Sequence, residues 1–145
     1  MRVGIYFTLA ALLGSACAFA DDDAERAKLI GSWRADAPAL QWSFSYTTTS
    51  VKVTENDGGN TIADFACTVD SKPCDVKIAG KKASVSFWFN GGKLVEMETC
   101  GKDTLQRRFT VDSGDVLQID VVPMEGRGKR ETLQYKRAPA ATAQK

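Results

Sequence analysis

Hydrophobic and polar residues alternate along most of the chain after residue 30, with the period of two that is typical of β-strands. The clearest case is 40–46, where Leu, Trp, Phe and Tyr alternate with Gln and Ser. Similar alternation is found in the segments 83–89, 93–100, 104–111 and 116–121. Turn residues such as those from Asn56 to Gly59 separate the segments and tolerate a positive φ. The pattern predicts about eight to ten short strands joined mostly by hairpins.

The predicted fold is an all-β, antiparallel up-and-down barrel, because consecutive hairpins place neighbouring strands side by side and closure removes the sheet edges. The acidic start and the helix formers of 21–30 predict a short N-terminal helix across one end of the barrel. We expect the large alternating side chains to face inward. This inner set comprises Trp33, Leu40, Trp42, Phe44, Tyr46, Phe87, Phe89, Met97, Phe109, Leu117, Ile119 and Tyr135.

The first twenty residues have the features of a secretory signal peptide. Arg2 precedes an apolar run, and Ala18 to Ala20 form an A-x-A cleavage site. The run is shorter than the roughly 20 residues that a membrane span needs. Cys17 leaves lipoprotein processing open as an alternative, although Gly14 stands where that cleavage box has a large aliphatic residue. We therefore expect a periplasmic or secreted protein.

The remainder divides into one barrel domain, 21–137, and a tail, 138–145, whose small residues and proline predict disorder. The chain has 19 Lys and Arg residues against 18 Asp and Glu residues, and removal of Arg2 with the leader makes the mature chain neutral. Neutrality argues against nucleic acid or an anionic membrane as a partner. No segment after the leader is apolar enough to span a membrane.

Three cysteines remain after cleavage, and one pair is expected to form a disulfide in an oxidising compartment. Cys67 and Cys74 flank a short loop that a disulfide closes easily, so this pair is favoured. The rival pairing joins Cys74 to Cys100.

The chain contains no histidine, which excludes Ser–His and Cys–His nucleophiles and removes the usual zinc ligand. Glu96 and Glu98 share one strand face, but this face lies opposite Val95 and Met97, so both glutamates are expected to face solvent. Cys100 has no evident cationic partner that would activate its thiol. We therefore expect no catalytic residues, no metal site and no cofactor.

Two segments carry a resemblance to a known superfamily. Gly31, Ser32 and Trp33 open the first strand, and Tyr135, Lys136 and Arg137 end the last one. In these features the chain resembles the calycin superfamily, and within it the small bacterial lipocalin-like proteins. The resemblance implies that the Trp33 indole plugs one barrel end under a basic side chain. Arg137 is the candidate for that side chain, with Lys136 as the alternative.

Arg107 breaks the inside–outside pattern, because it shares a strand face with Leu105 and Phe109. A buried guanidinium needs an anion. In fatty-acid-binding calycins an interior arginine grips the ligand carboxylate, and the similarity suggests this role for Arg107. The alternatives are an internal Glu or Asp partner, or a position at the barrel mouth from which Arg107 reaches water.

These inferences lead to an exported, non-enzymatic barrel that binds a small hydrophobic molecule. The expected ligand-binding residues are Trp42, Phe44, Tyr46, Phe87 and Arg107. The alternative is an exported protein-binding barrel, such as a protease or lysozyme inhibitor. That function would use the acidic segment 21–25 or the Cys67 to Cys74 loop as its contact surface.

Overall fold

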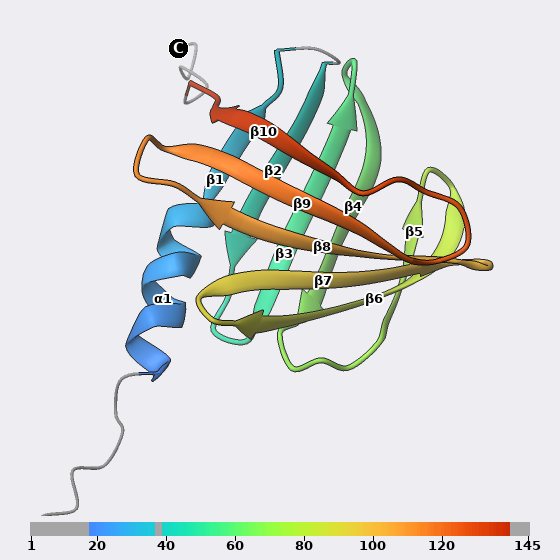
Figure 1. Cartoon of the computed structure of the whole chain (residues 1–145), viewed down its shortest axis with the longest axis horizontal. Helices are drawn as coiled ribbons and strands as arrows, with labels where there is room; N and C mark the ends of the chain where they lie inside the picture. Colours follow the sequence, from blue (N-terminus) through green and yellow to red (C-terminus); the bar gives the residue numbers. More distant parts are fainter. Residues whose placement is uncertain (1–17, 37–38, 140–145) are drawn as a thin grey trace, which may run out of the picture.

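The computed structural model describes residues 18–36 and 39–139, which form one helix and ten strands (Figure 1). The helix, α1, spans Ala18–Leu29. The strands are β1 (Gly31–Arg34), β2 (Leu40–Tyr46), β3 (Ser50–Asp57), β4 (Asn60–Thr68), β5 (Cys74–Ile78), β6 (Lys81–Asn90), β7 (Lys93–Cys100), β8 (Asp103–Val111), β9 (Val116–Glu125) and β10 (Glu131–Arg137).

The ten strands form a closed antiparallel barrel in which each strand pairs with its neighbours along the chain, and β1 pairs with β10. The predicted up-and-down barrel is therefore confirmed. Tight turns make this topology possible. Gly91 and Gly92, between β6 and β7, have φ angles of 57° and 74°, which glycine adopts without the steric cost of a Cβ atom.

Helix α1 packs against β2, β7 and β8 and covers one end of the barrel, which we call the helix end (Figure 1). The opposite end, with the turns at 58–59, 79–80 and 101–102, is called the far end. The helix begins at Ala18, so it crosses the predicted cleavage site between Ala20 and Asp21. Residues 1–17 of the predicted leader and 140–145 of the predicted tail lie outside the described residues.

The barrel wall is weakest between β4 and β5, where Ala63 and Ile78 are the paired residues. A disulfide between Cys67 and Cys74 joins the same two strands, with a Cα–Cα distance of 6.0 Å. The favoured pairing is confirmed, and Cys100 is a free, half-buried thiol. The disulfide thus links two strands that few backbone hydrogen bonds hold together.

The core fills the helix half of the barrel. Trp42, Phe44 and Phe109 form an aromatic cluster with ring centroids 5.2 to 6.0 Å apart. Below it, towards α1, Trp33 and Leu29 are almost fully buried. Of the predicted inner set, Leu40, Tyr46 and Phe89 are half-buried and pack against this core, whereas the others except Met97 belong to it.

The prediction of which face of β7 points into the barrel was wrong. Glu96 and Glu98 are buried on the inner face, with 1% and 8% of their surfaces exposed, and half-buried Met97 belongs to the opposite, outer face. Strand β7 has apolar residues on both faces, and fully buried Leu94, opposite Phe109, determines which face is the inner one. On the outer face Val95 is flanked by its neighbours on β6 and β8 and is buried too.

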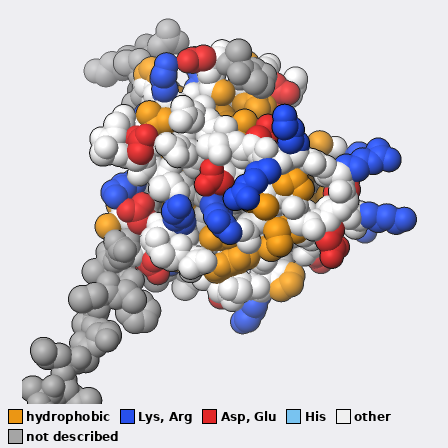
Figure 2. Space-filling model, in the orientation of Figure 1, with side chains coloured by type: hydrophobic (Ala, Val, Ile, Leu, Met, Phe, Trp, Pro, Cys, Tyr) orange, Lys and Arg blue, Asp and Glu red, His pale blue; other side chains and the backbone are white. Residues whose placement is uncertain are grey.

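The outer surface carries both signs of charge, and Figure 2 shows acidic and basic side chains interspersed with hydrophobic ones. Among the described residues, the large hydrophobic side chains of Ile30 and Met124 are 47% and 53% exposed. In the same part of the chain, no helix has the length and apolar character needed to cross a membrane.

Candidate functional site

Trp33 and Arg137 together close the helix end of the barrel. Trp33 is fully buried, and its Nε1 donates a hydrogen bond to the Leu29 carbonyl oxygen at 3.0 Å. The Arg137 guanidinium carbon lies 4.1 Å from the centroid of the Trp33 ring, a cation–π contact. Lys136, the alternative candidate, points elsewhere and pairs with exposed Asp36 at 3.0 Å.

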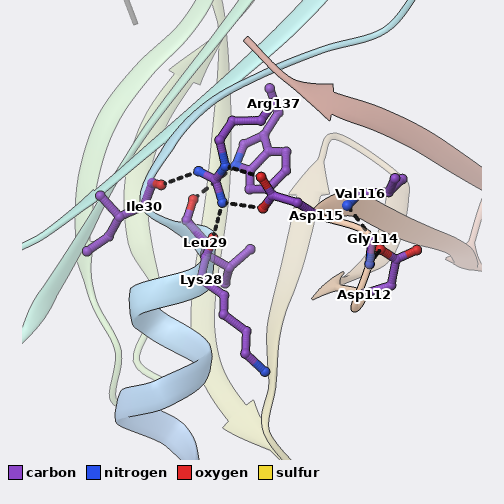
Figure 3. A network of polar contacts seen from close by, with 9 residues as sticks. Lys28, Leu29, Ile30, Asp112, Gly114, Asp115, Val116 and Arg137 are labelled. Atoms are coloured by element: carbon purple, nitrogen blue, oxygen red, sulfur yellow. Dashed lines mark hydrogen bonds and ion pairs between the residues drawn. The ribbon is translucent and has the colours of Figure 1, made fainter. Parts of the chain in front are cut away.

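Arg137 also fixes the chain around it, as Figure 3 shows. Its Nη1 and Nη2 atoms donate to the carbonyl oxygens of Ile30 and Lys28 at 2.9 and 3.0 Å. Its Nε and Nη2 atoms both donate to the Asp115 carboxylate at 2.7 Å. These hydrogen bonds hold the pKa of Asp115 below its ordinary value. Asp115, in the turn between β8 and β9, is thus the anionic partner of Arg137.

The motif needs glycine at position 31. Gly31 has a φ of 124°, and a Cβ atom there would lie 2.9 Å from Arg137 Nη1. Any side chain would strain the backbone and crowd the guanidinium. Gly31 and Trp33 therefore both contribute to the closed packing at this end of the barrel.

A buried ionic cluster lies inside the barrel. Arg107 of β8 donates from Nη1 to Glu96 Oε1 at 2.9 Å and to Glu98 Oε2, both on β7. The guanidinium carbon lies 5.5 Å from the Trp42 ring centroid. Of the alternatives for Arg107, the structure thus provides an internal carboxylate partner, and it provides two.

The electrostatics of the cluster follow from burial and an excess of acid. Burial raises the pKa of Glu96 to about 7; Arg107 opposes this rise, and the Glu98 and Glu55 carboxylates add to it. Burial also raises the pKa of Glu55 on β3 above its ordinary value. Burial disfavours the charged guanidinium of Arg107, but Glu96 and Glu98 outweigh it and raise its pKa.

One atom of the cluster has no partner. Glu96 Oε2 is buried and accepts no hydrogen bond from any described residue. A buried polar atom without a partner is unusual in folded proteins and requires an explanation.

The predicted ligand-binding residues fall into two groups. Trp42, Phe44 and Phe87 are buried on the inner wall, and Phe87 lies opposite Glu96 in the β6–β7 pairing. Trp42 and Phe87 thus lie beside the ionic cluster that contains Arg107, and Phe44 stacks on Trp42. Tyr46 lies apart from them, at the helix end, where the Arg26 guanidinium carbon is 6.0 Å from its ring centroid.

The inner wall is less tightly covered towards the far end. Leu105 and Val121 are the cross-strand neighbours of Glu98 and Arg107, and Leu133 on β10 pairs with Ile119, two residues before Val121. All three are apolar, inward-facing in the strand register and only half-buried. Phe65 and Val76, on the two strands of the weak wall, are half-buried too. Apolar inner surface therefore stays accessible at this end.

No protein-family model matches the chain, and a search of curated proteins finds no match either. Solved structures do match. A Schistosoma mansoni fatty acid binding protein in complex with arachidonic acid has a TM-score of 0.63 and 15% identity, over 79% of this chain and 98% of its own. Fatty-acid-binding protein 1 of Echinococcus granulosus has a TM-score of 0.65 and 7% identity, over 77% and 98%.

An abundant heat soluble (SAHS) protein from Ramazzottius varieornatus has a TM-score of 0.65 and 10% identity, over 77% of this chain and 96% of its own. At these identities the likeness establishes the fold. The chain shares its barrel fold with these fatty-acid-binding proteins.

Proposed function

We propose that this calycin barrel binds a small hydrophobic molecule in its interior and catalyses no reaction. The observation that carries the proposal is the contrast between the two ends. Trp33, Leu29 and Arg137 seal the helix end, whereas apolar inner-wall residues remain half-buried towards the far end. A small hydrophobic molecule would cover this apolar surface, and the solved structures with this fold include fatty-acid-binding proteins.

The proposal that the barrel catalyses no reaction is supported by the kinds of residue in the chain. The chain has no histidine, and Arg107 holds Glu96 and Glu98, the two adjacent carboxylates that could act as an acid and a base. Among the described residues, no group of three acidic or cysteine side chains could hold a metal ion. A binding protein is the function that this set of groups supports best.

The proposal includes export and the finer assignment to small bacterial lipocalin-like proteins. The predicted leader, 1–20, supports export. The disulfide between Cys67 and Cys74 supports it as well, because disulfides persist in oxidising compartments.

The experiment compares two tryptophan substitutions at adjacent valines. Val121 faces the interior and Val122 faces outward, and both are half-buried on β9. Val121→Trp should fill the proposed site and weaken binding of the neutral fluorescent probe Nile red by roughly tenfold, whereas Val122→Trp should leave it unchanged. Equal effects of both substitutions, or no uptake of the probe by the wild-type protein, would contradict interior binding.

A further inference from the structure

The interior of the barrel holds more acid than base. Glu55 on β3 and Glu96 and Glu98 on β7 act on the same guanidinium, that of Arg107. The carboxylates come from strands far apart around the barrel, β3 and β7, and all three interact electrostatically with Arg107. A ligand that enters this space therefore meets a predominantly negative environment.

Arg107 is already engaged by carboxylates of the protein. Its Nη1 atom donates to both Glu96 and Glu98. A ligand carboxylate would have to use the remaining N–H groups of the guanidinium, and it would lie beside these like charges, which repel it in a poorly solvated site. The cluster therefore selects against anionic ligands.

Glu96 has an unused acceptor. Its surface is 1% exposed, and its Oε2 atom has no hydrogen-bond partner among the described residues. Oε1 is held by Arg107, so the free oxygen is fixed in place on the inner face. A hydrogen-bond donor on a ligand would satisfy this oxygen, and a positively charged donor would also offset the excess of negative charge.

Two side chains of the cluster are partly exposed and have apolar neighbours. The side chains of Arg107 and Glu98 are 16% and 11% exposed, so water reaches them. Their cross-strand neighbours Val121 and Leu105 are apolar and half-buried. A ligand with an apolar body would lie against these side chains while its polar group reached Glu96.

We propose that the ligand is a hydrophobic amine, bound as its ammonium ion at Glu96, and not a fatty acid. This inference rests on the proposed function, because it names the chemical class of the molecule held in that same interior site. Charge complementarity at the Glu96 oxygen supplies the selectivity, and the apolar wall supplies contact area.

The inference predicts a pH dependence. Burial raises the pKa of Glu96 to about 7, so ionisation near neutral pH creates the full counter-charge for an ammonium group. The groups that face Glu96 are Arg107, Glu98 and Glu55. Arg107 stays charged, because its pKa is raised above an already high value. Amine binding should therefore strengthen by up to roughly tenfold between pH 6 and 8, as the ionised fraction of Glu96 rises.

The test measures displacement of bound Nile red by three ligands of equal chain length, dodecylamine, dodecanol and dodecanoate. The expected order at pH 7.5 places the amine roughly tenfold ahead of the carboxylate. Glu96→Gln should remove most of this preference, and Glu55→Gln should weaken it, which gives a second variant should the first not fold. Glu125→Gln, at an exposed position on β9, is the matched control and should keep the preference.

The outcomes separate the two proposals. Displacement by dodecanoate at concentrations equal to or below those of dodecylamine would overturn the amine assignment and leave hydrophobic binding intact. A preference that persists in both Glu96→Gln and Glu55→Gln would also overturn it. Failure of the wild-type protein to bind Nile red or any of the three ligands would overturn the proposed function, and the amine assignment with it.

Discussion

Replacement of Glu96 by glutamine should change how stability depends on pH. Burial raises the pKa of Glu96 from 4.5 to about 7, so the folded protein keeps a proton that the unfolded chain releases in this range. The folded state binds more protons than the unfolded state there, and stability falls as pH rises. At about 1.4 kcal/mol per pKa unit, the full shift corresponds to about 3 kcal/mol. Glutamine does not titrate and should not lose this stability.

The relevant quantity is the difference in unfolding free energy between Glu96→Gln and the wild type. Between pH 4.5 and 8, the unfolding free energy of Glu96→Gln should rise relative to that of the wild type by about 3 kcal/mol. Urea unfolding at several pH values, followed by the fluorescence of buried Trp33 and Trp42, measures it. The exposed control Glu125→Gln should show a difference that is nearly constant with pH. A constant or falling difference for Glu96→Gln would refute the reasoning.

Two further substitutions test the plug and the disulfide. Arg137→Met should lower the unfolding free energy by about 2 kcal/mol, because it removes the cation–π contact and the charged hydrogen bonds. Lys136→Met should cost less than about 0.5 kcal/mol in the same urea titration. Equal effects of the two substitutions would contradict a role of Arg137 in closing the helix end. Replacing Cys67 and Cys74 together by serine should cost about 2 to 3 kcal/mol, and the midpoint of thermal unfolding should fall for this variant but stay near that of the wild type for Cys100→Ser.

Local sequence patterns predicted the barrel well because its connections are short. Alternation over 40–46 assigned the inner wall of β2 correctly, and glycine-containing turns located the hairpins. In such a topology, strand order follows chain order. The closing pair, β1 with β10, is the one that local patterns do not determine, and there the Gly-x-Trp resemblance supplied the information.

The ionic cluster was missed because β7 has apolar side chains on both faces. Val95 and Met97 on one face suggested that Glu96 and Glu98 lay outside. The hairpin register contained the missing signal. The turn at Gly101 pairs Cys100 with Asp103, and this register places Glu96 opposite Arg107. Because an inward-facing arginine needs an anion, this register would have identified the face of β7 that carries Glu96 and Glu98 as the inner face.

Asp115 illustrates a different limit. Asp115 follows the turn at Asp112 and Gly114, where an acidic residue needs no explanation beyond turn geometry. Its bidentate contact with Arg137 follows from the pairing of β9 with β10, in which Val116 lies opposite Lys136 and the adjacent residues Asp115 and Arg137 come together. The alternation within either strand does not determine this register.

Native mass spectrometry of the protein purified from the cells that make it, before and after denaturation, tests the central claim most directly. The account predicts a native mass above that of the polypeptide, and release on unfolding of a small apolar molecule that carries an amine. A native mass equal to that of the bare chain, together with no mass increase after incubation with dodecylamine, would contradict the claim that the barrel binds a hydrophobic ligand.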